Sequence, residues 1–144
     1  MARKYLPIRG DGREFRLRLT VRGQRELKRE FQEETLQTIF MAASDSERMC
    51  ALLQEALNWP ESGNTITDGE VFYDLLVDWG WHGQERFGEL AFDLAAASGL
   101  ITEHQACQLK ESLHAAVAQA FSQMGQNVEE ETEGEKSKDP FPLR

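Results

Sequence analysis

The chain has 144 residues, of which 40% are hydrophobic and 28% are charged, and its formal net charge at pH 7 is −9. This size and composition are typical of one water-soluble globular domain. No window approaches the roughly 18 continuous apolar residues that a membrane span needs, so we expect no membrane partner. The first residues contain no apolar run of the kind found in secretion signals, so we expect the protein in the cytosol.

The charge is divided unevenly along the chain. Residues 1–34 hold a net charge of +4, and residues 35–144 hold a net charge of −13. Because an acidic body repels phosphate backbones, we expect no nucleic-acid partner, and we interpret the N-terminal arginines as the solvated face of a strand. The same asymmetry allows copies of the chain to attract one another head to tail, which leaves a homo-oligomer open.

The first segment has the alternating pattern of a β-hairpin. Phe15, Leu17 and Leu19 alternate with charged residues, and the sequence at residues 10–12, Gly-Asp-Gly, suits a tight turn. A lone two-stranded hairpin is marginal in water. Its apolar face must therefore pack on helices or on another chain.

From Thr20 onward the apolar residues recur at helical spacing. Thr20 is expected to cap a first helix, in which Leu27 and Phe31 share one face. Capping-box sequences open three further helices, at residues 44–47, 67–70 and 102–105, with the last helix ending at Gly125. Two more helices are expected, around residues 36–43 and 84–98. The predicted fold class is mainly α: an N-terminal β-hairpin followed by five or six short helices and a disordered acidic C-terminal tail.

The tail is predicted from composition. Residues 126–144 contain six acidic and three basic residues, with two prolines near the end. Such a segment cannot bury enough apolar surface to offset an ordering entropy of roughly 1–2 kcal/mol per residue. We therefore expect one hairpin-plus-helical domain over residues 1–125 and a disordered acidic tail over residues 126–144.

Histidines and cysteines form no recognisable metal or redox motif. His82, His104 and His114 lack the three- or four-residue spacing that places two imidazoles on one helical face. Cys50 and Cys107 lie in apolar helical stripes without a CxxC partner, so we interpret them as structural free thiols.

Carboxylates offer the one alternative for chemistry. Glu70, Asp74 and Asp78 recur every four residues on one expected helix and could hold a metal or transfer protons. We interpret them as the solvated face of that helix, because no nucleophile-elbow or phosphate-loop motif accompanies them. The sequence therefore predicts no enzyme activity, no catalytic residues, no cofactor and no metal.

Four segments, taken in order, carry a resemblance to a known family. A hairpin strand runs straight into a helix at residues 12–31, and a leucine pair precedes a tryptophan at residues 51–59. A capped helix with an aromatic residue and a leucine pair follows at residues 67–76, and Ala-Ser-Gly ends a later helix at residues 97–99. This order resembles the tail assembly chaperones of long-tailed bacteriophages. The chain departs from their compact members in its longer last helix, its Trp79/Trp81 pair and its charged tail.

The resemblance implies a chaperone that coats the tape measure protein in the host cytoplasm and then gives way to tail tube protein. Its partners would be those two proteins, and it would need no cofactor. An apolar set is expected to contact the client: Phe15, Leu17, Leu27, Phe31, Trp81 and Phe92. Ordinary core packing is the alternative for all of these except Trp81, and it is the preferred interpretation for Leu17 and Leu27.

Two other hypotheses stay open at this point. A small phage or bacterial regulatory protein could use its acidic surface to bind and inhibit a basic host protein. An enzyme could use the three acids of residues 70–78 as a metal site, in which case Mg²⁺ or Mn²⁺ would stabilise the fold.

Overall fold

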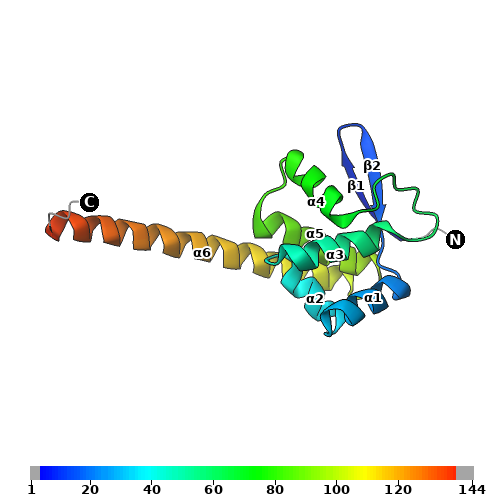
Figure 1. Cartoon of the computed structure of the whole chain (residues 1–144). Coiled ribbons are helices and arrows are strands. Elements are labelled where there is room, and N and C mark those ends of the chain that lie inside the picture. Colours follow the sequence, from blue (N-terminus) through cyan, green and yellow to red (C-terminus); the bar gives the residue numbers. More distant parts are fainter. Residues whose placement is uncertain (1–3, 139–144) are drawn as a thin grey trace. The chain divides into compact units, whose positions relative to one another are not determined.

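The computed structural model describes residues 4–138, with side chains through residue 124, and it confirms a mainly helical chain that begins with a β-hairpin (Figure 1). The elements follow in chain order as β1 (Leu6–Gly10), β2 (Arg13–Leu17), α1 (Val21–Phe31), α2 (Thr35–Ala42), α3 (Ser46–Leu57), α4 (Gly69–Asp78), α5 (Gly83–Ala97) and α6 (Glu103–Lys138). The chain divides into two compact units, Met1–Glu111 and Ser112–Arg144. The boundary expected from composition lies further along, between residues 125 and 126.

The hairpin forms where the alternation predicts it. β1 and β2 pair antiparallel, with Ile8 opposite Phe15 and Leu6 opposite Leu17. Asp11 and Gly12 take positive φ angles of 52° and 74°. Two successive residues with positive φ give the two-residue turn whose twist matches that of the strands.

The apolar face of the hairpin belongs to the core of the first unit. β2 contacts α3, and β1 contacts α5. The Phe15 ring meets the Phe72 ring edge-on at 5.0 Å and the Trp79 ring at 6.3 Å between centroids. A Cβ on Gly10 would lie 2.5 Å from the Trp79 ring. The strand therefore approaches this tryptophan as closely as only a glycine permits.

Side-chain caps fix the helix starts, although Asp45 and Asp68 are the N-caps of α3 and α4, one residue later than the capping boxes at residues 44–47 and 67–70 predict. The Thr20 hydroxyl accepts a hydrogen bond from the Gly23 N–H at 3.2 Å, and Asp68 accepts from the N–H groups of Glu70 and Val71. Thr102 and Gln105 cap each other's N–H groups, at 2.9 and 3.0 Å. These bonds satisfy amide groups that the first turn of a helix leaves without partners.

Helix α3 lies at the centre of the first unit. It contacts α1, α2, α4 and β2, while α2 also contacts α5. Leu52, Leu53 and Leu57 of α3 are fully buried. Where α4 begins, a Cβ on Gly69 would lie 2.0 Å from the Cys50 carbonyl oxygen. Glycine at this position is therefore what lets α4 pack directly on the α3 backbone.

The last helix is longer than expected. It continues past Gly125 to Lys138, because a single glycine costs a helix only about 1 kcal/mol and the first proline comes at residue 140. The expected disordered tail thus overlaps residues 126–138, whose backbone is helical, and its last part, residues 139–144, lies outside the described residues. Within the described part of the chain, no helix is both long enough and apolar enough to cross a bilayer.

Candidate interaction surface

Four of the six residues expected to contact a client lie in the core. Phe15, Leu17, Leu27 and Phe92 are each at most 7% exposed. For Leu17 and Leu27 this burial matches the preferred interpretation as core, whereas for Phe15 and Phe92 it corrects the expectation of a client contact. An apolar face can be covered by the chain's own helices or by a partner, and here α3 and α5 pack against the hairpin.

The other two expected residues are half-buried beneath arginines. The guanidinium carbon of Arg48 lies 5.0 Å from the Phe31 ring centre, and that of Arg86 lies 3.9 Å from the Trp81 ring centre. The Trp81 ring also lies 5.9 Å from that of Phe87. Each of the two aromatic rings thus makes a cation–π contact with an arginine that covers it.

Exposed apolar side chains occur elsewhere, on α2. Phe40 and Met41 are 48% and 39% exposed, and the Phe40 ring meets buried Phe92 edge-on at 6.0 Å. Ile39, the residue before Phe40, is fully buried. Adjacent helical residues point about 100° apart, so burial of Ile39 turns Phe40 outward. The same geometry exposes Val71 beside buried Phe72 on α4.

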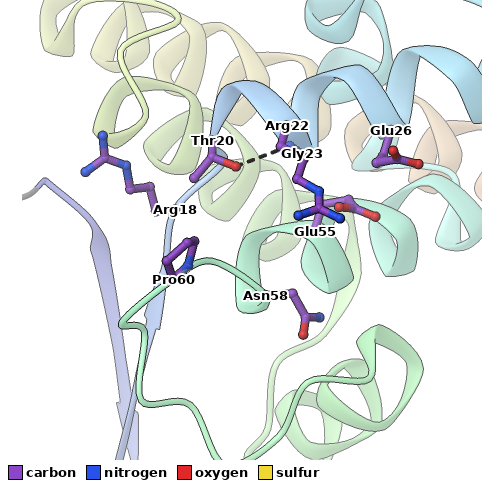
Figure 2. Close-up of a pocket in the computed structure, with 8 residues that line it drawn as sticks. All are labelled: Arg18, Thr20, Arg22, Gly23, Glu26, Glu55, Asn58 and Pro60. Carbon is purple, nitrogen blue, oxygen red and sulfur yellow. Dashed lines mark hydrogen bonds between the residues drawn. The ribbon is translucent and has the colours of Figure 1, made fainter.

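A hollow of about 890 Å³ lies where α1 begins and α3 ends (Figure 2). The side chain of Arg22 reaches from α1 toward Glu55 of α3 (Figure 2). Four groups of residues line it: Arg18 after β2; Thr20, Arg22, Gly23 and Glu26 from α1 and its cap; Glu55 and Asn58 from α3; and Pro60 from the following loop.

A second hollow of about 630 Å³ lies against the first half of α3, with Glu55 again in its wall. Its remaining lining residues come from α1, α3 and α4: Glu30, Ser46, Glu47, Cys50, Ala51, Gln54, Glu70, Tyr73 and Asp74. Since Glu55 borders both hollows, we name the pair the α3 trough. The first hollow carries Arg18 and Arg22 together with Glu26, and the second carries four carboxylates besides Glu55 and, among the described residues of its lining, no basic side chain.

Burial and nearby negative charges raise the pKa values of three groups in the trough. Burial raises the pKa of Glu55, and the nearby Glu26 and Glu30 raise it further, whereas Arg22 lowers it. Burial also raises the pKa of the Cys50 thiol and the Tyr73 hydroxyl, and Asp74 adds to both effects. A thiol with a raised pKa is a poor nucleophile at neutral pH. The trough is therefore suited to attracting cations at its acidic end and unsuited to thiolate chemistry.

The acids proposed as a metal site do not converge. Glu70, Asp74 and Asp78 are exposed on α4. Among the described residues, no three histidine, cysteine or carboxylate side chains are grouped as a metal site would require. His82 and His104 are exposed as well.

No family model, curated protein or solved structure matches the chain. Its function therefore has to be inferred from its own residues.

The trough was not predicted from the sequence, and its composition explains why. Arg18, Arg22 and Glu55 come from three elements that only the tertiary fold brings together. The N-terminal arginines were interpreted as a solvated face, and no role was expected for Glu55. The one sequence signal that anticipated the trough is the division of the chain into a basic first quarter and an acidic remainder.

Proposed function

We propose that this protein acts by binding another polypeptide, as an interaction protein and not as an enzyme. More specifically, we propose that it is a tail assembly chaperone of a long-tailed bacteriophage. Its client is the tape measure protein, which it keeps soluble in the host cytoplasm until tail tube protein takes its place.

The observation that carries this proposal is the α3 trough. It consists of two open hollows that share Glu55: the first holds Arg18 and Arg22 beside Glu26, and the second is lined by carboxylates from α1, α3 and α4. Such a charge gradient orients a bound segment, because the client's acidic end is drawn to Arg18 and Arg22 and its basic end to the acids.

Glu55 supports the same interpretation. It lies in the wall of both hollows, and its carboxylate is disfavoured there by burial and by the neighbouring acids. A charge held at a cost to stability is typical of functional sites, where a partner's opposite charge offsets that cost. A lysine or arginine of the client is the group that fits.

Apolar contact with the client comes from α2, which packs against α3. Phe40 and Met41 leave large parts of their side chains exposed. Covering such surface contributes about 25 cal/mol per Å² before ordering costs. This contribution to the binding free energy is modest. A modest value fits a chaperone that must later release its client.

Co-expression with the tape measure protein from the same phage tests the proposal. The expected result is that the client moves from the insoluble to the soluble fraction and co-purifies with the tagged chain. An unrelated acidic helical protein of similar size is the control for a general effect of acidic proteins. If the client stays insoluble and no complex is recovered, the proposed function is wrong.

The acidic end of the trough also favours a second candidate, a regulatory protein that binds a basic host protein. The two functions respond differently to salt. A contact that depends mostly on charge is lost at high ionic strength, whereas a chaperone–client contact with an apolar component is retained. Pull-downs from host lysate at low and high salt, beside the tape measure complex, separate the two.

A further inference from the structure

The side of the hairpin that faces away from the helices is basic. Ile8, Phe15 and Leu17 are buried on the helix side, and because successive side chains of a strand point to opposite faces, their neighbours project outward. The charged residues at these outward positions, which we name the hairpin outer face, are Arg9, Glu14, Arg16 and Arg18. Three arginines against one glutamate make this face positive in a chain whose formal net charge is −9.

The strand register brings the three arginines together. Arg16 lies opposite Pro7 and Arg9 lies opposite Glu14. Arg9 and Arg16 are therefore diagonal neighbours on one face, no more than roughly 7–8 Å apart at their Cβ atoms. Arg18 follows two residues after Arg16, which is a step of about 7 Å along an extended strand. One short ligand can therefore reach all three guanidinium groups.

Neutral groups hold two of these guanidinium groups in place. The Arg16 guanidinium carbon lies 5.2 Å from the Tyr5 ring centre, and the Tyr5 ring stacks on that of Trp59 at 6.2 Å. Arg18 Nη1 donates to the Lys4 carbonyl oxygen at 3.3 Å. A ring and a carbonyl oxygen leave the positive charge uncompensated, and a guanidinium stacked on a ring keeps N–H donors in its plane for a further partner.

The third guanidinium group is paired only weakly. Arg9 Nη2 lies 3.4 Å from Glu14 Oε2, and the Arg9 side chain is 70% exposed. Exposed ion pairs of this kind contribute about 0–1 kcal/mol. An incoming carboxylate can therefore replace Glu14 at little cost.

We propose that the hairpin outer face binds an extended acidic segment of a partner polypeptide, with carboxylates at alternate positions. In an extended segment, alternate side chains lie on one side and repeat about every 7 Å, which matches the step from Arg16 to Arg18. Each guanidinium can receive a carboxylate through two parallel N–H···O bonds. The backbone of Arg16 is already bonded to Asn64, so side chains hold the segment and it does not join the sheet.

Charge favours an acidic polypeptide over a nucleic acid as the occupant. Residues 35–144 hold a net charge of −13, which repels a long, evenly charged polyanion but admits a short segment with two or three carboxylates. Affinity for a phosphate backbone grows with the number of phosphates neutralised, and this face offers three arginines. The inference goes beyond the proposed function, because it concerns a surface outside the second, acidic hollow and a ligand of the opposite charge.

Fluorescence anisotropy with a labelled peptide of alternating glutamate and threonine tests the proposal. We expect the full chain to bind this peptide at about 20 mM salt and to bind it more weakly at about 200 mM. Arg16→Ala should lower the affinity at least about fivefold. Arg25→Ala is the matched control, since it removes the same charge from an exposed position on α1, and it should change the affinity less than about twofold. No binding at low salt, or equal effects of the two variants, overturns the proposal.

Two further measurements separate the site and the ligand from their alternatives. Figure 2 shows Arg22 pointing toward Glu55 in the trough, whereas the Arg18 side chain points away from both. Arg22→Ala should therefore weaken peptide binding less than Arg16→Ala does, and an equal or larger loss would place the peptide in the trough and overturn the proposal. A single-stranded oligonucleotide of the same charge should bind more weakly than the peptide, and equal or tighter binding would contradict an acidic polypeptide as the partner. Because the probe is a free peptide, these outcomes are independent of whether the protein binds a tape measure protein.

Discussion

The side chain of Asn64 closes the outer edge of the hairpin by pairing with the backbone of Arg16. The Arg16 N–H donates to Asn64 Oδ1 at 2.8 Å, and Asn64 Nδ2 donates to the Arg16 carbonyl oxygen at 2.7 Å. Across the hairpin, the register partner of Arg16 is Pro7, which has no N–H to offer. At the Pro7–Arg16 pair, the backbone groups of β2 are already bonded to Asn64 and β1 has no N–H. Neither edge therefore offers both a free backbone donor and a free acceptor to a further strand, which protects the hairpin from edge-to-edge association.

Replacing Asn64 by aspartate should destabilise the fold. Asn64→Asp removes the donor that also reaches the Leu57 carbonyl oxygen at 3.0 Å, and it places a carboxylate against two carbonyl oxygens. We expect the free energy of unfolding to fall by about 2–3 kcal/mol. Urea denaturation measures this change. Thr65→Ala, at the exposed neighbour, should cost less than about 0.5 kcal/mol, and equal losses would show that Asn64 has no special role.

Alanine at residue 69 should disrupt the packing of α4 on α3. The Cβ of Gly69→Ala would lie 2.0 Å from the Cys50 carbonyl oxygen and 2.9 Å from the Gln54 amide nitrogen, both on the α3 backbone. We expect a loss of about 3 kcal/mol or more in denaturant unfolding. Gly23→Ala is the comparison, because its Cβ would meet no atom closer than 3.2 Å: the end of the Leu19 side chain lies at 3.2 Å and the Glu55 Cβ at 3.3 Å. A similar cost for the two variants would contradict the close approach of the helices.

The pH dependence of stability should report on Glu33. Its carboxylate accepts hydrogen bonds from Arg48, at 2.8 and 3.0 Å, and from the buried Thr38 hydroxyl at 2.6 Å. The Arg48 hydrogen bonds, followed by that of Thr38, lower the pKa of Glu33 from 4.5 to about 2. A lowered carboxyl pKa means that its stabilisation is complete above pH 4.5 and is lost as the pH falls toward 2.

Thermal unfolding of the wild type and of Glu33→Gln from pH 7 to pH 2 measures this contribution. The wild type should melt higher above pH 4.5, and the difference between the two melting temperatures should close between pH 4.5 and about 2. Glu34→Gln is the control, since the Glu34 side chain is 80% exposed. A difference that stays constant with pH would show that Glu33 is not held by Arg48.

Neutralising Glu55 should stabilise the folded chain. Burial and the acids Glu26 and Glu30 raise the pKa of Glu55, so its charged form is disfavoured in the native state at neutral pH. We expect Glu55→Gln to raise the melting temperature at pH 7. The advantage should shrink as the pH falls and the wild-type carboxyl takes up its proton. A lower melting temperature at pH 7 would mean that Glu55 has a stabilising partner in the native chain.

The helices and the hairpin could be predicted from the sequence because turns and helix caps are determined by residues that are neighbours in the chain. The Asp11–Gly12 turn and the Thr20, Asp68 and Thr102 caps each depend on a few neighbouring residues. The end of α6 was placed too early because Gly125 was taken as a stop, although a glycine inside a helix is tolerated at modest cost.

Which apolar face is buried could not be predicted from the alternation alone. Phe15 and Leu27 have the same pattern whether they meet a client or the chain's own α3, and only the tertiary fold decides. The lining of the trough is harder still to predict, because Arg18 and Glu55 are far apart in sequence and each is an ordinary charged residue by itself.

The most direct test of client binding along the α3 trough compares two charge reversals on α1. Arg22 lines the trough, whereas Arg25 is exposed on the same helix outside it. Each variant is co-expressed with the tape measure protein that we propose as the client, and the soluble tape measure protein recovered per mole of variant is measured. We expect Arg22→Glu to reduce this recovery by about tenfold or more and Arg25→Glu to change it less than about twofold. Equal recovery with both variants, at wild-type level, would contradict binding in the trough.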